Sequence, residues 1–278
     1  MSQVVEDILS SVDNESGALL SGRPLLGDQS DSIPVINPAN EQQVSSICET
    51  SPAQVAEIVE HAKAAFKSGN WSRAQLSERQ TVLRKAARLI RENTEQLAAL
   101  DSLTTGLLYH KSTLRHVAAA ADWFDYFAEF IGDEPVMAFN TAAGIETTVS
   151  REAAGVAALF TPWNIPLMGA ALKLAAALAM GNSCIIKPSE QSPLGTWKLV
   201  QLIHEAGLPE GVLHLVNGRG AITGAALAGH VDVDLISFTG GEQAGRQIAK
   251  AAADRFAKVT MELGGKSANI ICEDADYD

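Results

Sequence analysis

The feature that most constrains the fold is a regular alternation of short apolar strands with helical segments, which begins at Gly155 and continues to the C-terminus. Each run of strand-forming residues is followed by a segment whose apolar positions have helical spacing. The predicted strands are 156–160, 183–187, 212–216, 233–238, 259–263 and 268–272. Helices are predicted over 167–180, 221–228 and 243–253, and another begins at 192–193 and ends at 207. Because strands that alternate with helices form right-handed parallel crossovers, the expected fold is α/β with a doubly wound parallel sheet.

The part of the chain before this alternation is predicted to be mostly helical. Residues 1–34 are polar and contain turn signals, so we expect an arm that could contain a short strand. A strand that ends at Asn37-Pro38 is expected to pair with 44–48, and residues 137–151 alternate around Ala143-Gly144 as a projecting hairpin would. Helices are predicted from Ser51-Pro52 to about 69, from a capping box formed by Ser77 and Gln80, and over 110–131. The aromatic residues of 110–131 are expected to lie in the core or in a subunit interface.

The first motif is Thr161-Pro162-Trp163-Asn164, at the end of the predicted strand 156–160. Pro162 cannot donate to a sheet and forces a turn, and ligands of parallel sheets collect at the carboxyl ends of strands. The Asn164 amide could therefore donate a hydrogen bond to a reacting oxygen, which is typically worth about 3 kcal/mol of transition-state stabilisation. Asn164 could instead simply cap the following helix.

The second motif, Lys187-Pro188-Ser189-Glu190, directly follows the strand 183–187. An ammonium and a carboxylate at this edge can hydrogen-bond the two hydroxyls of a ribose, and the carboxylate would repel a 2′-phosphate. The alternative is a surface ion pair around a turn.

The third motif is a glycine-rich turn from a strand to a helix. Thr239-Gly240-Gly241 and Gly245 follow the strand 233–238, and Gly218, Gly220 and Gly224 form a similar turn one unit earlier. Such a turn lets backbone N–H groups at a helix N-terminus approach a pyrophosphate. It is not the GxGxxG fingerprint, and a glycine-rich turn alone is weak evidence.

The fourth motif, Glu262-Leu263-Gly264-Gly265-Lys266, ends an apolar strand. A carboxylate that is partly desolvated there would have a raised pKa and could act as a general base toward water. Pairing with Lys266 is the alternative.

Composition limits the possible partners. The net charge of −12 argues against nucleic acid or an anionic membrane, because such partners are held by Lys and Arg patches. The three cysteines, Cys48, Cys184 and Cys272, form no metal-ligand or disulfide pattern, so neither a metal nor a disulfide is expected. With no secretory signal and no apolar run of bilayer length, a cytoplasmic location is expected.

Taken together and in this order, the four motifs closely resemble the aldehyde dehydrogenase superfamily, over about Val35 to Asp278. The resemblance implies a Rossmann-like fold, an aldehyde substrate and NAD rather than NADP. It implies Asn164 as oxyanion donor, Glu262 as base and, less directly, Lys173 near the site. For the cofactor it implies Lys187 and Glu190 on the adenosine ribose, with Thr161, Pro162, Trp163, Ser189, Gly220, Thr239, Gly240, Gly241, Gly245 and Leu263 along the dinucleotide.

The chain departs from the family pattern at three places. Gly241 replaces a serine that contacts pyrophosphate in many members, and Ala153-Ala154 replaces a proline-containing dipeptide. The family's nucleophilic cysteine lies some tens of residues beyond the fourth motif. Cys272 is too close to Glu262 to match it, and it is interpreted as a packing residue at the end of a buried strand.

The function implied by the resemblance is NAD-dependent oxidation of an aldehyde to a carboxylic acid through a cysteine thiohemiacetal, with the nucleophile missing from this chain. A catalytically inactive NAD-binding or subunit-interaction fragment is the alternative. The expected organisation is an arm (1–34), a helical part of the cofactor domain (35–132), an oligomerisation hairpin (133–151), the NAD-binding domain (152–262) and the start of a catalytic domain (263–278). A homodimer or homotetramer is expected for the full-length form.

Overall fold

The predicted alternation forms the centre of a seven-stranded sheet in the computed structural model, which describes residues 16–26, 28–132 and 137–276. The parallel strands are β7 (Val156–Phe160), β8 (Ser183–Lys187), β9 (Leu213–Val216), β10 (Leu235–Gly240) and β11 (Lys258–Leu263). Two antiparallel strands, β1 (Ser16–Leu20) and β2 (Arg23–Leu26), extend the sheet beyond β9. The strand order is β11-β10-β7-β8-β9-β1-β2, which confirms the predicted fold class.

The order of the strands places a switch point beside β7. The chain first adds β8 and β9 on one side of β7, and then crosses back to add β10 and β11 on the other side. Ligands of doubly wound sheets bind at the carboxyl ends of strands where the direction of winding reverses. The ends of β7 and β10 are therefore the expected location of a ligand.

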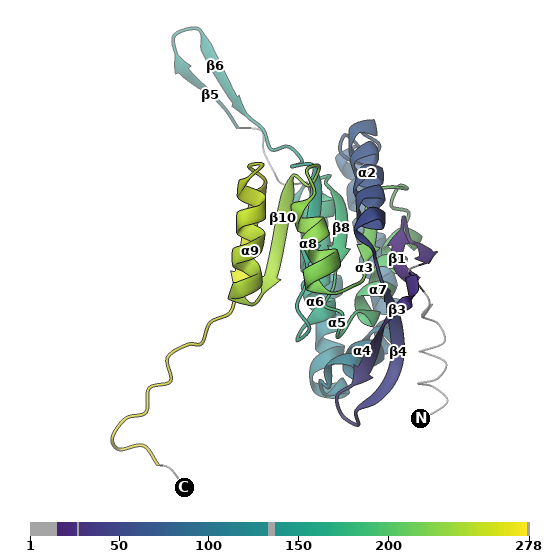
Figure 1. The fold of residues 1–278 in the computed structure, drawn as a ribbon. Coiled ribbons are helices and arrows are strands. Elements are labelled where there is room, and N and C mark those ends of the chain that lie inside the picture. The colour runs from purple at the N-terminus through teal and green to yellow at the C-terminus, as the bar shows by residue number, and fades with distance from the viewer. Residues whose placement is uncertain (1–15, 27, 133–136, 277–278) are drawn as a thin grey trace.

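Helices cover both faces of this sheet (Figure 1). One layer consists of α3 (Leu76–Glu92), α4 (Thr94–Thr105), α5 (Leu114–Phe130), α6 (Pro166–Ala179) and α7 (Leu194–Glu205). The other consists of α2 (Pro52–Ser68), α8 (Ala225–Gly229) and α9 (Glu242–Ala253). Two π-helical turns, η1 (Tyr109–Thr113) and η2 (Gly220–Gly224), precede α5 and α8.

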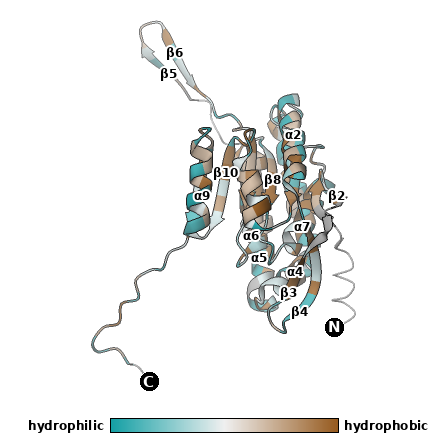
Figure 2. Ribbon diagram, viewed as in Figure 1, coloured by the Kyte–Doolittle hydropathy of each residue, from teal (hydrophilic) through white to brown (hydrophobic). Residues whose placement is uncertain are grey.

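The alternation of side chains along β7 explains the three layers. Ala157 and Leu159 pack in the cluster that contains α3 to α7, whereas Val156, Ala158 and Phe160 pack in the cluster that contains α2, α8 and α9. A strand that is apolar at every position can pack in this way only if both faces of the sheet are covered. In Figure 2 the central strands are accordingly brown, while α2 and α9 carry hydrophilic residues among the hydrophobic ones.

Most predicted helix ends agree with the structure, and one cap was predicted wrongly. Ser51 is the N-cap of α2 and forms a capping box with Gln54, and Gly69 ends this helix with a φ of 84°. The second helix begins earlier than predicted: its capping residue is Gln75, paired with Glu78, so Ser77 lies inside the first turn. Both boxes have the same spacing, and the sequence alone did not distinguish them.

Other elements also differ from the prediction. Residues 16–26, expected to belong to a polar arm, form β1 and β2 of the main sheet. Helix α4 was not predicted, because its apolar residues continue the pattern of α3 across Asn93. The predicted helix 110–131 is divided into η1 and α5. Residues 268–272 form no strand; they belong to a segment that extends away from the domain after β11, in yellow in Figure 1.

Two hairpins complete the chain. β3 (Asp28–Asn37) pairs with β4 (Gln42–Glu49), and β5 (Met137–Ala142) pairs with β6 (Ile145–Val149) around Gly144, as predicted. The β5–β6 hairpin projects from the amino-terminal edge of the sheet (Figure 1). Within the described ranges, no helix is long and apolar enough to cross a membrane.

Candidate functional site

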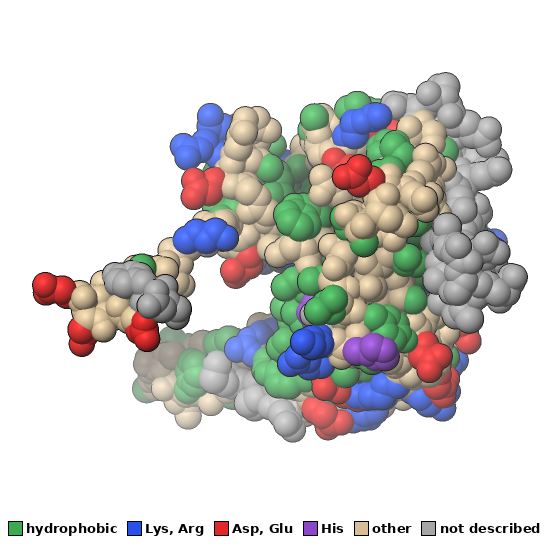
Figure 3. Space-filling model, turned by 90° about the horizontal axis from the view of Figure 1, so that it is seen from below, with side chains coloured by type: hydrophobic (Ala, Val, Ile, Leu, Met, Phe, Trp, Pro, Cys, Tyr) green, Lys and Arg blue, Asp and Glu red, His purple; other side chains and the backbone are tan. Residues whose placement is uncertain are grey.

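A cavity of about 520 Å³ lies where the ends of β7, β8 and β10 meet. Ten of the residues expected to contact a dinucleotide line it, although they come from four separate stretches of the chain. They are Thr161, Pro162, Trp163, Lys187, Ser189, Glu190, Gly220, Thr239, Gly240 and Gly241. Figure 3 looks onto this carboxyl-terminal side of the sheet, where hydrophobic side chains reach the surface between charged groups.

The Lys187 and Glu190 side chains form an ion pair in the wall of this cavity. Lys187 Nζ lies 3.7 Å from Glu190 Oε2, and the two side chains are 5% and 33% exposed. The Lys187 Nζ also donates to the Pro188 carbonyl oxygen at 3.1 Å. Burial lowers the pKa of Lys187, and the charge of Glu190 opposes this shift. The pair is therefore not a surface ion pair, because its lysine is almost fully enclosed.

The glycine turns leave backbone exposed toward the cavity. A side chain added at Gly220 or Gly241 would meet no atom within 4 Å, so both positions open onto free space. Gly241 is also the N-cap of α9, and no side chain caps that helix. The first N–H groups of α9 are thus available to an anion at the edge of the cavity.

Thr161 and Trp163 offer further groups for a ligand. Thr161 lines the cavity, and its Oγ1 is buried without a hydrogen-bond partner among the described residues. Trp163 is 57% exposed beside it, and its carbonyl oxygen accepts a hydrogen bond from Ser192 Oγ at 3.0 Å. An orphaned hydroxyl, open glycines and a Lys–Glu pair with a buried lysine fit the ribose and pyrophosphate of a dinucleotide.

Gly245 and Leu263 lie just outside the cavity lining. Gly245 is the fourth residue of α9, and a Cβ there would contact the Leu263 side chain at 2.5 Å. Leu263 pairs with Gly240 across β10 and β11. The two residues therefore pack behind the glycine turn rather than in its open wall.

The three residues expected to act in catalysis do not line the cavity. Lys173, on α6, donates from Nζ to Ser237 Oγ at 2.7 Å. Burial lowers the pKa of Lys173 to about 8, and the nearby charge of Glu262 opposes the shift. Asn164 and Glu262 are exposed, so Glu262 lacks the desolvation that the sequence predicted. Because Ile165 occupies the N-cap of α6 and no side chain bonds there, Asn164 is not a helix cap.

The cysteines correct one interpretation. Cys48 and Cys184 are buried, and burial raises the pKa of the Cys184 thiol. Cys272 was interpreted as a packing residue of a buried strand, but it is exposed in the extended segment after β11. Among the described residues, no group of His, Cys, Asp or Glu side chains is arranged to hold a metal ion.

Other residues of the site were not predicted. The rings of Phe160 and Phe238 lie 6.1 Å apart in the cavity lining, and mostly apolar residues of α8 and α9 form another part of it. Those helix residues are Ala225, Ala228, Ala244, Gln247, Ile248 and Ala251. Nothing in their local sequence distinguishes them from ordinary core positions, because only the packing of α8 and α9 turns them toward the cavity.

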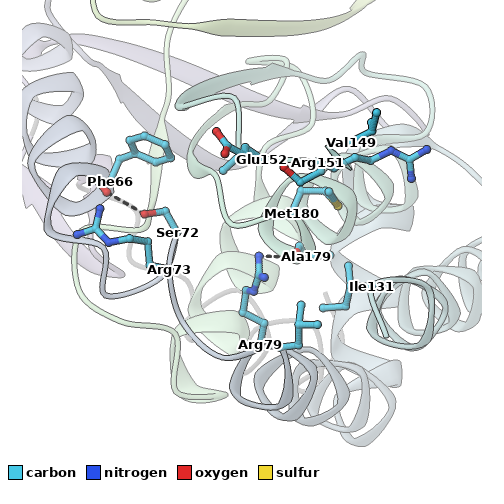
Figure 4. A pocket seen from close by; sticks show the side chains of 13 residues that line it. Phe66, Ser72, Arg73, Arg79, Ile131, Val149, Arg151, Glu152, Ala179 and Met180 are labelled. Atoms are coloured by element: carbon cyan, nitrogen blue, oxygen red, sulfur yellow. Dashed lines mark hydrogen bonds between the residues drawn. The ribbon is translucent and has the colours of Figure 1, made fainter. Parts of the chain in front are cut away.

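A second cavity, of about 670 Å³, lies near the base of the β5–β6 hairpin (Figure 4). Arg79 extends from α3 toward Ala179 and donates to its carbonyl oxygen at 3.0 Å, while Arg73 donates to Ser68 O at 2.9 Å and points away from the centre. This cavity is at the amino ends of the strands, opposite the switch point. The smaller cavity is therefore the candidate site.

Comparison with known proteins agrees with this geometry. The profile described as "Aldehyde dehydrogenase family" matches residues 26–278. The chain is 40% identical over 246 residues to betaine aldehyde dehydrogenase of Bacillus subtilis (strain 168), which covers 88% of this chain and 50% of that protein. It is 35% identical over 270 residues to an NADP/NAD-dependent aldehyde dehydrogenase of Escherichia coli (strain K12), covering 97% and 54%.

A solved structure shows the same fold. The NAD+ complex of betaine aldehyde dehydrogenase from Staphylococcus aureus superposes with a TM-score of 0.92 at 32% identity, over 100% of this chain and 55% of that one. The chain spans about half the length of the curated relatives it matches. The family match over residues 26–278, together with the shared fold, shows that this protein belongs to the aldehyde dehydrogenase family.

Proposed function

We propose that this chain binds NAD along the carboxyl edge of its sheet, as the cofactor-binding part of an aldehyde dehydrogenase that oxidises an aldehyde to a carboxylic acid. The observation that carries the proposal is the enclosed Lys187–Glu190 pair in a cavity at the switch point. NAD, when bound, would supply the hydride acceptor. The NAD+ complex of the Staphylococcus aureus relative supports the same choice of cofactor.

In this proposal the two halves of the dinucleotide meet different groups. Lys187 donates to the adenosine ribose hydroxyls and Glu190 accepts from them. The Thr161 hydroxyl, which has no partner among the described residues, and the N-terminus of α9 serve the polar groups between ribose and nicotinamide. Because a carboxylate repels a phosphate, Glu190 favours NAD over NADP.

For the reaction itself, we assign roles to three residues that lie outside the cavity lining. Asn164 donates to the oxyanion, Glu262 takes a proton from the attacking water, and Lys173 stabilises charge close to Glu262. The interaction of Lys173 with Glu262 supports the last role. The nucleophile would be a cysteine outside these 278 residues, because Cys48 and Cys184 are buried and Cys272 lies in the extended segment.

Calorimetric titration of the chain with NAD and with NADP tests the proposal. We expect NAD to bind more tightly, and Lys187→Met to weaken NAD binding by about tenfold or more, since hydrogen bonds to charged groups contribute about 1.5–3 kcal/mol. Glu190→Gln should narrow the preference for NAD over NADP. Lys198→Met, which removes a lysine outside the cavity lining, is the control. No heat of binding with NAD would contradict the proposal.

An inactive NAD-binding or subunit-interaction module remains the second candidate. The projecting hairpin favours it, because Phe139, Ile145 and Val149 expose apolar surface there. Incubation of the chain with NAD and propanal tests whether one of its own cysteines is the nucleophile, and NAD binding without NADH formation is expected of this chain for either candidate. Measurable turnover would instead show that one of its own cysteines acts as the nucleophile.

A further inference from the structure

A buried carboxylate of the β3–β4 hairpin, called the N-terminal hairpin below, lies directly behind the cofactor cavity. Glu49, the last residue of β4, is 4% exposed. Its Oε1 accepts hydrogen bonds from the Arg219 backbone N–H at 2.7 Å and from Thr223 Oγ1 at 2.6 Å. Its Oε2 accepts from Arg219 Nη1 at 2.7 Å. A buried charge with this many short, charge-assisted bonds holds its partners firmly.

The partners of Glu49 belong to the turn that follows β9. Further contacts attach the same turn to Thr50, the residue after β4: Thr50 N–H donates to Asn217 O at 2.9 Å, and Thr223 Oγ1 also lies 2.8 Å from Thr50 O. Gly218 has a φ of 145°, and a Cβ there would clash with Glu49 Oε1 and Thr223 Oγ1. Glycine is therefore required where the carboxylate presses against the backbone.

The turn that Glu49 holds, residues 217–224, is one wall of the cavity. Gly220, Ala221 and Gly224 line it. Gly224 also faces the stem of Lys187, since a Cβ at this glycine would lie 3.5 Å from Lys187 Cδ and Cε. The position of this wall consequently sets how closely a ligand can approach Lys187.

Glu49 also acts on Lys187 through charge. Burial lowers the pKa of Lys187, and the charges of Glu190 and then Glu49 oppose this shift. These two carboxylates, one from the turn after β8 and one from β4, are the acidic groups that act on the lysine, and the Arg219 guanidinium is paired with Glu49. Loss of Glu49 would remove one of the two charges that keep the lysine protonated.

We propose that Glu49 is a positioning residue of the cofactor cavity, which fixes the 217–224 wall through its bonds to Arg219 and Thr223. The inference rests on the proposed function, because it assigns Glu49 a role in binding NAD that Lys187 carries out. Glu49 lies 170 residues before Arg219 in the sequence and outside all four motifs. The N-terminal hairpin is thereby part of the binding machinery.

Calorimetric titration of the full chain with NAD, over a range of pH, tests this role. The Glu49→Gln variant keeps the shape but removes the charge and turns an amide NH2 toward the donors of Arg219 and Thr223. We expect its Kd for NAD to rise roughly tenfold, the equivalent of about 1.4 kcal/mol. The fall in affinity at high pH should also begin at a lower pH than in the wild type. The control is Glu60→Gln, which makes the same charge change at an exposed carboxylate on α2. It should leave the Kd for NAD and its pH dependence unchanged.

Thr223→Val provides a second variant should Glu49→Gln fail to fold. It removes only the hydroxyl contact, so we expect a smaller rise in Kd and faster amide hydrogen exchange in residues 217–224 than in the rest of the sheet. Wild-type affinity and an unchanged pH profile in the folded variants would overturn the inference, even if their melting temperature fell. If the wild type itself fails to bind NAD, the proposed function fails first, and this role fails with it.

Discussion

Two lysines at the site show how neighbouring groups set the state of a side chain. Lys187 is buried and Lys173 is half-buried, and burial lowers the pKa of each. Lys187 has two carboxylates that oppose the shift, whereas Glu262 is the one charged group that acts this way on Lys173. Lys173 also donates to the neutral Ser237 hydroxyl. Lys187 is thus suited to hold an anionic or hydroxyl-bearing ligand, and Lys173 to exchange a proton near neutral pH.

We predict that Lys173 titrates near pH 8, because burial lowers its pKa to about that value. The folded chain then binds this proton below about pH 8, whereas the unfolded chain binds it below about 10.4. Stability should therefore increase as pH rises through this interval. NMR of 13C-methylated lysines, with Lys173→Arg to assign the resonance, measures the titration. A midpoint near that of an exposed lysine would contradict the prediction.

At the scale of single elements, capping decides where the helices of the first half begin. Ser51 Oγ accepts from Gln54 N–H at 3.3 Å, and Gln54 Oε1 accepts from Ser51 N–H at 3.0 Å. Ser77 has an equally plausible sequence context, but the first turn of α3 has already begun at Leu76. The two serines therefore form a natural comparison.

We predict that Ser51→Ala destabilises the chain by about 1 kcal/mol, the usual cost of losing an N-cap side chain. Ser77→Ala should be neutral or slightly stabilising, since alanine is the better helix former inside a turn. Urea unfolding followed by circular dichroism measures both variants against the wild type. Equal losses in the two variants would show that the cap of α3 lies at Ser77 after all.

The pairing of β1 with β9 depends on a buried, neutral histidine. His214 Nδ1 accepts from the Ser21 N–H at 3.0 Å, and its Nε2 lies 3.0 Å from the Gly211 carbonyl oxygen. Both ring nitrogens are satisfied only in the neutral tautomer that carries its proton on Nε2. Burial lowers the pKa of His214 to about 3 and also lowers that of neighbouring His204.

We predict a loss of stability as pH falls below about 6.5, because the unfolded chain then binds a proton that folded His214 does not take up until about pH 3. The slope for one such group is at most about 1.4 kcal/mol per pH unit. Urea unfolding between pH 7 and pH 4.5 measures it. His214→Gln should flatten the dependence, whereas exposed His110→Gln should not. An unchanged slope in His214→Gln would contradict this assignment.

At the scale of the whole molecule, the β11 edge of the sheet and the segment after it present uncovered apolar surface. β11 is an edge strand whose residues are mostly exposed, and the segment after it exposes Ile270 at 83%. Ile271, Phe256 and Leu263 are also exposed. An open strand edge beside apolar side chains is a site for association.

We therefore predict that this chain associates with itself at micromolar concentrations. Replacing Ile270 and Ile271 together with Lys should shift the distribution toward monomer, because it removes two exposed apolar side chains. The matched control places Lys at Ser267 and Asn269, which are exposed and polar. Sedimentation velocity measures the distribution. A monodisperse monomeric wild type would refute the prediction.

The sequence by itself determined the α/β class, the strands of the parallel core and the positions of the four motifs. These features are encoded locally, by apolar runs, caps, prolines and glycines at strand ends, so each can be recognised within a few residues. The chemistry of Lys187 and Glu190 was also foreseeable, because both follow one strand directly. The sequence did not predict helix α4, the first turn of α3 or the absence of a strand at 268–272, because each depends on what packs against it.

Only the tertiary structure decided which groups face one another. The winding order brought the ends of β7, β8 and β10 to one cavity and left Asn164, Lys173 and Glu262 outside its lining. It also placed Glu49 behind the 217–224 wall, a contact between residues that no local pattern connects. The physical reason is that a side chain's burial and partners are set by packing across the sheet, whereas a strand or a cap is set by its neighbours in the chain.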